Sequence, residues 1–310
     1  MLSIITHKFK RIKPGIYVFL YHSVYKNRNI HPSIYEKVGT SVQIFREHID
    51  FFRSRFEIIR ASDINKIAQK KSGSIDKPYA VITFDDGFQD SLENGVVELS
   101  KYKLPATLFI CDRCASGYAG LWRFRLFLLL ESHKELAIRF LNNKMNWKGY
   151  NELQILSEAK KSFSSNMSAV IDDAWQELRD DKEDIQLFAS YDALKKINHD
   201  LFEFGSHTIS HPVLSRISYE EAKHEIIAGH QAVEQRIGTT IKYFAYPFGG
   251  KQHWNQDTER ILRKYTDWLV FSAYGGINFV NDNRNIKRIG LLNNSANDIL
   301  KTLHKQTKLN

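Results

Sequence analysis

Residues 81–87 read VITFDDG, an apolar run that ends in two adjacent carboxylates and a glycine. Short apolar runs bounded by polar residues or glycine are typical of buried parallel strands. Because burying a charge is costly without a partner, paired acids at the carboxyl end of a strand indicate a metal, a general base, or both. A turn at Gly87 can bend Asp85 and Asp86 toward one pocket. Taken alone, the pair is also compatible with a turn that carries two solvated aspartates.

Similar apolar runs recur along the chain. The run above belongs to a predicted strand at 79–84, and others predict strands at 16–21, 106–110, 202–205, 243–246 and 268–271. Helical patterns lie between them. One begins after Ser41, a favourable N-cap, and another after Ser218, where Glu221 completes a capping box and Gly238 is the expected stop. Alternating strands and helices predict an α/β fold with a parallel sheet, either open or closed into a barrel.

One stretch, at about 118–190, interrupts this alternation. Its pattern is mainly helical and rich in charge, and it contains no convincing strand. We expect a helical insertion, a lid or a flank, within a single domain that covers residues 1–310. Trp122, Arg123 and Arg125 at its start can face the site, although core and surface positions are the commoner roles of such residues.

A pair of histidines follows the strand at 202–205. Residues 204–212 read FGSHTISHP, which places His207 and His211 four apart. Side chains four apart lie on one side of a helical turn, so we expect both imidazoles to converge on one ion. Two neutral imidazoles and one carboxylate leave positions open for water, as a catalytic divalent site requires. Such a pair is often structural by itself, but much less often when an Asp-Asp-Gly strand end accompanies it.

A third motif at the end of a predicted strand occupies residues 244–250, which read FAYPFGG. Proline and two glycines favour a turn whose backbone amides can point inward. Backbone donors of this kind stabilise an oxyanion, each by about 2.7–4 kcal/mol in the transition state.

These three motifs together resemble the NodB-homology polysaccharide deacetylases, also called carbohydrate esterase family 4. The TFDDG of 83–87 matches the first motif of the family, the HTISHP of 207–212 matches the second, and the FAYPFG of 244–249 matches the third as it occurs in one branch. The resemblance runs from about residue 16 to residue 290, apart from the helical insertion. The LYHSV of 20–24 resembles the Tyr-His strand end of branches associated with bacterial surface-polysaccharide biosynthesis.

The resemblance implies a deformed, TIM-like (β/α) barrel and hydrolytic removal of an N-acetyl group from an aminosugar. It makes Asp85 the general base, and Asp86, His207 and His211 the ligands of a divalent ion. Zinc is the expected ion, with cobalt, manganese, nickel and iron(II) as alternatives. The ion would polarise the acetamide carbonyl and lower the pKa of the attacking water, which Asp85 deprotonates.

Parts of the family pattern are changed in this chain. Many members carry in the third motif an arginine that orients the base, whereas Ala245 stands here, and Arg288 is expected to supply the guanidinium from a later strand. No late histidine lies in a convincing motif for the general acid. His22 is therefore predicted to be the acid or a substrate contact, with a buried histidine that caps the first strand as the alternative. The backbone amide of Phe248 is the implied oxyanion donor, and Tyr246 is expected on the substrate side.

The chain is basic, with a formal charge of +9 and a pI near 9.3. This balance suits a phosphate-linked sugar, an acidic glycan or an anionic membrane surface, although a solvated basic surface explains it as well. No nucleic-acid motif accompanies the charge, so we expect no nucleic-acid partner. No apolar run approaches the roughly eighteen residues that a membrane span needs, and no signal-peptide pattern is present. We expect a cytoplasmic protein, with peripheral contact at the inner membrane face allowed and the oligomeric state left open.

Two alternative functions remain at this point. One is a deformylase, or another amide hydrolase, that acts on a lipid- or nucleotide-linked aminosugar. The other is a carbohydrate-binding barrel that has lost its activity. Loss of the base or of a metal ligand is the expected signature of an inactive barrel, yet all four residues are present.

Overall fold

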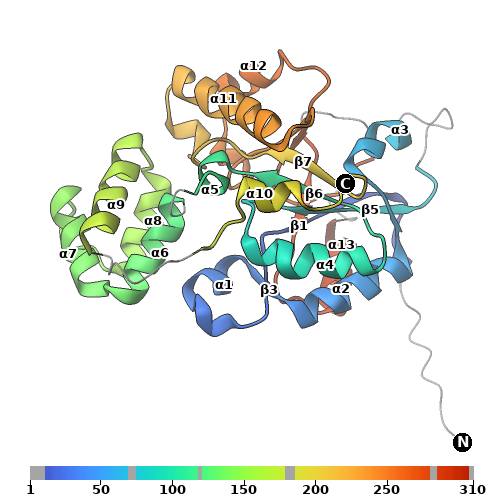
Figure 1. Cartoon of the computed structure of the whole chain (residues 1–310), viewed down its shortest axis with the longest axis horizontal. Coiled ribbons are helices and arrows are strands. Elements are labelled where there is room, and N and C mark those ends of the chain that lie inside the picture. Colours follow the sequence, from blue (N-terminus) through green and yellow to red (C-terminus); the bar gives the residue numbers. More distant parts are fainter. Residues whose placement is uncertain (1–10, 69–74, 118–120, 179–185, 280–284, 307–310) are drawn as a thin grey trace, which may run out of the picture.

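Parallel strands form a nearly closed barrel at the centre of the molecule (Figure 1). The computed structural model describes residues 11–68, 75–117, 121–178, 186–279 and 285–306. Every neighbouring pair in the barrel order is parallel. In spatial order the strands are β10 (Arg288–Gly290), β1 (Gly15–Tyr21), β5 (Pro78–Phe84), β6 (Ala106–Ile110), β7 (Phe202–Ser206), β8 (Tyr243–Ala245) and β9 (Leu269–Phe271).

The two ends of this order meet at Ile286, just before β10. Ile286 forms a parallel bridge with Phe271 of β9. Its amide donates to the carbonyl oxygen of Val270 at 2.8 Å, and its carbonyl accepts from the amide of Ser272 at 2.9 Å. The predicted α/β barrel is therefore confirmed, and the open sheet is excluded.

Strand β1 shows why the barrel strands are apolar along their whole length. Tyr17, Phe19 and Tyr21 belong to the core between the barrel and its outer helices, whereas Ile16 and Val18 belong to the cluster inside the barrel. Successive side chains of a strand point to opposite faces, and here both faces are covered.

Helices cover the outside of the barrel. They are α1 (Pro32–Val38), α2 (Val42–Arg55), α3 (Ile64–Ala68), α4 (Val97–Lys101), α11 (Tyr219–Ile237), α12 (Gln256–Leu262) and α13 (Ala296–Gln306), with a π-helical segment at Ser91–Val96 before α4. As predicted, Ser41 caps α2, and Ser218 and Glu221 form a capping box at the start of α11. α11 ends at Gly238, whose left-handed φ of 81° suits glycine.

Three short strands were not predicted from the sequence. β2 (Ser23–Tyr25) pairs with β3 (Gly39–Ser41) in a small separate sheet, and β4 (Glu57–Ile58) pairs with the start of β5. These segments are two or three residues long and lack the apolar run that marks β8 and β9, so nothing local distinguishes them from loops.

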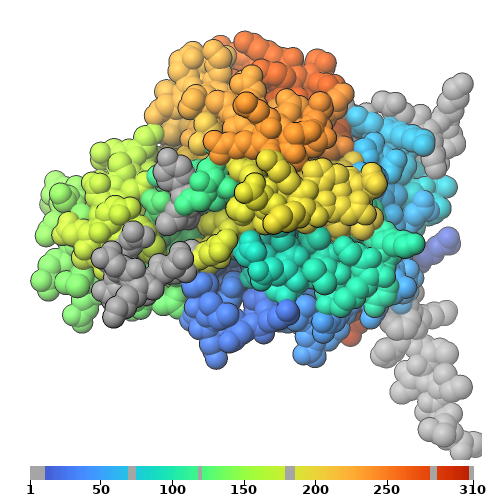
Figure 2. All heavy atoms as spheres, viewed as in Figure 1, coloured from blue at the N-terminus to red at the C-terminus, as the bar shows by residue number. Residues whose placement is uncertain are grey.

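The chain between β6 and β7 is helical. It contains α5 (Asp112–Ala115), α6 (Trp122–Ser132), α7 (Lys134–Lys144), α8 (Glu152–Lys161), α9 (Ser165–Leu178) and α10 (Tyr191–Lys195). Helices α6 to α9 form a lobe beside the barrel, green in Figures 1 and 2. Eight of the eleven residues of α6 are buried, because α6 packs against α7, α9 and α1. No helix in the described part of the chain is long and apolar enough to cross a membrane.

Candidate active site

Asp86, His207 and His211 come together at the carboxyl ends of two barrel strands. Asp86 lies two residues beyond β5, and His207 directly follows β7. Asp86 Oδ1 lies 3.5 Å from Nε2 of His207 and 3.5 Å from Nε2 of His211. All three side chains are buried, and one ligand atom from each lies within 4.8 Å of the others. This group is a candidate metal centre.

The protonation states at this centre fit a divalent cation. Burial, and then the charge of Asp85, raise the pKa of Asp86 well above its usual value, and Asp86 Oδ1 has no hydrogen-bond partner among the described residues. Burial lowers the pKa of both histidines, so their imidazoles are neutral at neutral pH. His207 Nδ1 lies 2.8 Å from the carbonyl oxygen of Ala245, which assigns the proton to Nδ1 and leaves Nε2 free as a ligand. A cation would satisfy the unpartnered carboxylate oxygen.

The helical turn predicted across His207 and His211 is wrong. The segment is an irregular loop in which Thr208 and His211 have φ angles of 68° and 58°. Thr208 Oγ1 accepts a hydrogen bond from the His211 amide at 3.0 Å and so holds the bend. The two imidazole rings converge as expected, with centroids 4.9 Å apart, but a strained loop and not a helix brings them together.

Helix α11 supports this loop from behind. The half-buried carboxylate of Glu225 accepts hydrogen bonds from the amides of Ile209 and Ser210, both at 2.9 Å, and from the Ser210 hydroxyl at 2.6 Å. Gly229 lies so close that an added Cβ would stand 2.8 Å from the carbonyl carbon of Thr208. The helix therefore fixes the position of the backbone between the two histidines.

Asp85 is held by Arg288. The guanidinium donates to both carboxylate oxygens, at 2.6 and 2.7 Å, and both side chains are buried. Burial alone raises the pKa of Asp85, but the charge of Arg288, then that of His207, and the hydrogen bonds of Arg288 outweigh it, so the pKa is lowered. Asp85 Oδ2 lies 3.7 Å from His207 Nε2. The chain thus places an ionised carboxylate directly beside the candidate metal centre.

The third motif forms a strained turn next to His211. Phe248 has a φ of 59°, and its ring packs edge-on against His211 with centroids 4.6 Å apart. The backbone amide of Phe248 donates to no backbone acceptor in the described ranges. The ring of Tyr246 instead stacks on Trp254, with centroids 4.3 Å apart, and does not line the active-site pocket. The position of Tyr246 therefore gives no support to its expected contact with substrate.

A pocket of about 230 Å³ opens beside these residues. His22, which follows β1, lines it together with Asp85 and Asp86. Burial lowers the pKa of His22 to about 4, although the charge of Asp85 opposes this shift. His22 is therefore neutral at neutral pH. Arg123 of α6 lines the same pocket, so the helical lobe contributes to the site.

The family follows from a comparison of sequences. Residues 72–266, more than half of the chain, match the family model described as polysaccharide deacetylase. This chain belongs to the polysaccharide deacetylase family. Membership makes it an N-deacetylase, a hydrolase that acts on amide bonds. No curated protein sequence matches the chain.

Solved structures of other deacetylases share the fold. The Streptococcus pyogenes deacetylase PplD, in complex with acetate, has 15% identity and a TM-score of 0.62, with 94% of this chain and 99% of that chain covered. IcaB from Ammonifex degensii has 18% identity and a TM-score of 0.60, with 94% and 98% covered. The de-N-acetylase from Aggregatibacter actinomycetemcomitans has 14% identity and a TM-score of 0.55, with 90% and 95% covered. At these identities the likeness establishes the barrel fold and no more.

Several residues at the deacetylase site carried no recognisable signal in the sequence. Lys37 of α1 and Lys160 of α8 line the pocket, and Glu225 and Gly229 of α11 support the loop between His207 and His211. Charged residues on amphipathic helices normally face solvent, so the sequence does not distinguish these from their neighbours. Lys160 lies near the candidate metal centre only because the helical lobe packs against the barrel.

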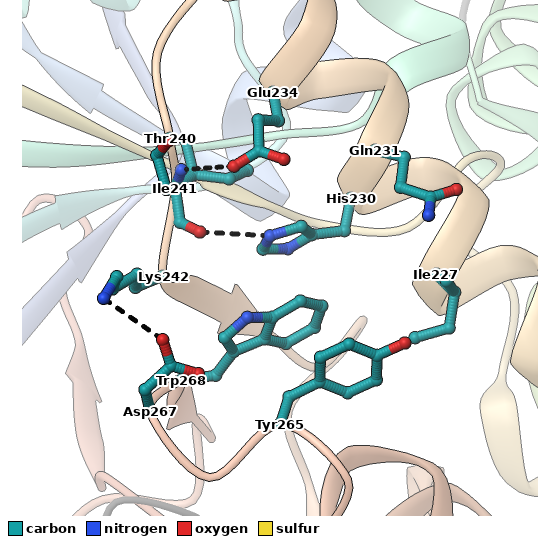
Figure 3. Close-up of a pocket in the computed structure, with 10 residues that line it drawn as sticks. All are labelled: Ile227, His230, Gln231, Glu234, Thr240, Ile241, Lys242, Tyr265, Asp267 and Trp268. Carbon is teal, nitrogen blue, oxygen red and sulfur yellow. Dashed lines mark hydrogen bonds and ion pairs between the residues drawn. The ribbon is translucent and has the colours of Figure 1, made fainter.

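A second pocket of the deacetylase lies at the amino ends of β8 and β9 (Figure 3). His230 stacks on Trp268 with ring centroids 3.6 Å apart, and Trp268 stacks in turn on Tyr265. Lys242 Nζ lies 3.1 Å from Asp267 Oδ2. His230 and Glu234 of α11 bond to the backbone of Ile241, so this pocket lies at the junction between α11 and the barrel.

Proposed function

We propose that this chain removes the N-acetyl group from an aminosugar in a glycan or glycan precursor, with a divalent ion held by Asp86, His207 and His211. The observation that carries the proposal is the buried, ionised Asp85 beside three converging ligands. Membership of the polysaccharide deacetylase family supports the same reaction. We expect zinc, because two imidazoles and one carboxylate are typical zinc ligands in catalytic sites.

Asp85 is the general base in this proposal. Arg288 binds both of its carboxylate oxygens, which fixes one orientation and keeps the group ionised, so that it can take a proton from the attacking water. When bound, the divalent ion supplies Lewis acidity, which activates water and polarises the acyl carbonyl.

Two further groups complete the reaction. We assign the backbone amide of Phe248 to the oxyanion that develops on the acyl carbonyl, because it is free of backbone acceptors in the described part of the chain and adjoins His211. The proton must finally reach the departing amine nitrogen. We assign His22 to this transfer, or to a hydrogen bond with the sugar. Since His22 is neutral at rest, it can donate a proton to the amine only after it has accepted one.

The test is a panel of N-acetylated and N-formylated glycans, nucleotide sugars and lipid-linked sugars, incubated with the metal-loaded chain. We expect acetate release that chelation abolishes and that zinc restores. Asp85→Asn should lower kcat by about 10²–10⁴-fold, the usual contribution of a general base, while the bound metal stays stoichiometric.

Two other results of this panel would favour the alternative functions. Formate release without acetate release favours the deformylase alternative. A chain that binds no stoichiometric metal and releases neither acid is an inactive barrel, which contradicts the proposal.

A further inference from the structure

Two cationic side chains of the helical lobe reach the active-site pocket. Arg123 lies in the first turn of α6, and Lys160 lies near the end of α8. The guanidinium carbon of Arg123 lies 5.1 Å from the centre of the Phe248 ring, and Lys160 Nζ lies 4.8 Å from the same centre. Because Phe248 packs directly on His211, both charges lie one side chain away from the candidate metal centre.

Neither of these two cations forms an ion pair with a carboxylate among the described residues. Nearby basic residues of the lobe do have carboxylate partners: Arg125 pairs with Asp172, and Lys161 Nζ lies 3.9 Å from Glu158. Among the described residues, neither Arg123 nor Lys160 has a carboxylate within 4.0 Å. Burial lowers the pKa of each; the charge of Asp86 opposes this shift for Arg123, and the charge of Arg123 lowers the pKa of Lys160 further. Holding two like charges together in a partly buried position is unfavourable unless an anion joins them.

Contact with the Phe248 ring does not account for this arrangement by itself. A cation over an aromatic face gains little at exposed sites, and a single cation is sufficient for this interaction with the ring. The exposed Lys37 of α1 also lines the pocket, with its Nζ 3.8 Å from Glu36. Two carboxylates line the pocket, and both have other partners: Asp85 pairs with Arg288, and Asp86 belongs to the candidate metal centre. The lining is therefore positive overall, and a bound divalent ion would make it more so.

We propose that Arg123 and Lys160 bind an anionic group, a phosphate or a carboxylate, which the aminosugar substrate carries close to its N-acyl group. A guanidinium offers a planar fork of donors to such oxygens, and an ammonium offers a compact point charge. The helical lobe then selects the substrate, while the barrel supplies the reacting groups. This inference rests on the proposed function and narrows its substrate class.

The test compares kcat/KM for acetate release from charged and neutral substrates. The charged substrates are N-acetylglucosamine 1-phosphate, a nucleoside-diphosphate N-acetylaminosugar, a polyprenyl-diphosphate N-acetylaminosugar and an N-acetylated disaccharide that contains a uronic acid. The neutral reference is the methyl glycoside of N-acetylglucosamine. The four charged arms distinguish a simple phosphate, a nucleotide, a lipid carrier and a carboxylate as the source of the anion.

We expect the unaltered chain to prefer at least one charged substrate over the neutral reference by tenfold or more. Arg123→Gln and Lys160→Gln should each reduce that preference by about tenfold, mainly through KM. Added salt should reduce it further, because the interaction is electrostatic. Lys161→Gln is the matched control: it removes the same charge one residue further along α8, from a side chain that is 74% exposed, and should leave the preference unchanged.

Equal kcat/KM on charged and neutral substrates overturns the inference. So does an equal loss on both in the two variants, which is the result expected if the cations serve only to pack Phe248. Failure of the proposed function is separable, because then no sugar releases an acyl group in a metal-dependent way. In that case calorimetric titration with the sugar 1-phosphate still decides: equal binding by the unaltered chain and by Lys160→Gln overturns the inference, and loss of binding in the variant supports it.

Discussion

At the scale of single residues, the Asp85–Arg288 pair sets the charge state of the proposed base. Both side chains are buried, and a buried carboxylate without a partner tends to be protonated. Arg288 reverses this tendency, so the pKa of Asp85 lies below its ordinary value. Arg288 comes from the last strand of the barrel, about two hundred residues from Asp85 in sequence, and its proximity depends on closure of the barrel.

Arg288→Gln should therefore shift the pH dependence of the reaction. Without the guanidinium, burial dominates and the pKa of Asp85 rises. Because activity requires the ionised carboxylate, the acidic limb of kcat/KM against pH should move to higher pH. Loss of one partner from a buried pair should also lower the free energy of unfolding by about 3–5 kcal/mol. Arg288→Lys keeps the charge and should shift the limb less. An acidic limb that stays in place in Arg288→Gln would contradict the role of Arg288.

His22 offers a second test at this scale. His22→Ala should lower kcat by about 10²–10³-fold if the imidazole relays a proton to the amine. The metal content should not change, because His22 lies outside the group of converging ligands. Full activity in this variant would leave His22 as a residue that only caps the end of β1.

At the scale of elements, helix α11 determines the shape of the loop that carries His207 and His211, the two proposed histidine ligands. Glu225 satisfies the loop amides, and Gly229 allows the close approach of the helix to Thr208. Glycine in a helix interior normally costs about 1 kcal/mol relative to alanine, so its presence here has a packing reason. The loop is strained at Thr208 and at His211, and it keeps this form because the helix holds it.

Gly229→Ala should for this reason weaken metal binding. Helix propensity favours alanine by about 1 kcal/mol, but the new Cβ would stand 2.8 Å from a backbone carbon, which forces the loop to move. We expect a lower melting temperature and about a tenfold loss of zinc affinity, as is usual when outer support of a ligand is disturbed. Gln231→Ala, at an exposed position of the same helix, is the control. Unchanged zinc affinity in Gly229→Ala would show that the loop does not need this contact.

At the scale of the whole molecule, buried neutral histidines join the barrel to its outer layers. His48 Nε2 donates to the carbonyl of Asn294, and its Nδ1 accepts from the Tyr21 hydroxyl at 2.9 Å. His230 Nε2 lies 3.1 Å from the Ile241 carbonyl, and its Nδ1 lies 3.1 Å from Ser206 Oγ. In both cases the geometry assigns one proton, on Nε2. A second proton, on Nδ1, would reverse its hydrogen bond with the hydroxyl and leave a buried positive charge, and burial lowers the pKa of both rings.

Stability should therefore fall in acid. The pKa of His230 is about 4 in the folded chain, below its ordinary value of 6.5. A depressed histidine pKa means that the stabilisation is complete above pH 6.5 and is lost as the pH falls from there through about 4. By linkage the loss reaches about 3 kcal/mol for this one group. His230→Gln removes the titration and should flatten the dependence of unfolding free energy on pH between 7.5 and 4.5.

This measurement is made by urea denaturation of the chelated chain, so that release of metal does not contribute. The control is His224→Gln, an exposed histidine on the same helix, which should leave the pH dependence as it is. Equal slopes in His230→Gln and in the unaltered chain would exclude this contribution of His230.

Local pattern was sufficient to predict much of the architecture and which residues gather at the candidate site. Barrel strands such as 106–110 can be predicted from their apolar runs, because both faces of such a strand are buried. The caps of α2 and α11 can be predicted because they are short-range hydrogen-bonding motifs. Asp85, Asp86, His207 and His211 could be predicted because each follows a strand, and the carboxyl ends of parallel strands share one rim.

Tertiary structure alone decided the rest. The convergence of His207 and His211 depends on a strained loop that α11 holds in place, where the sequence predicted a helical turn. The aromatic Tyr246 lies in a stack with Trp254 and away from the pocket. The cations Arg123 and Lys160 meet at Phe248 because the helical lobe docks on the barrel. Local sequence encodes strands, caps and strand-end residues through neighbouring atoms along the chain, whereas contacts between separate elements depend on packing that no local pattern records.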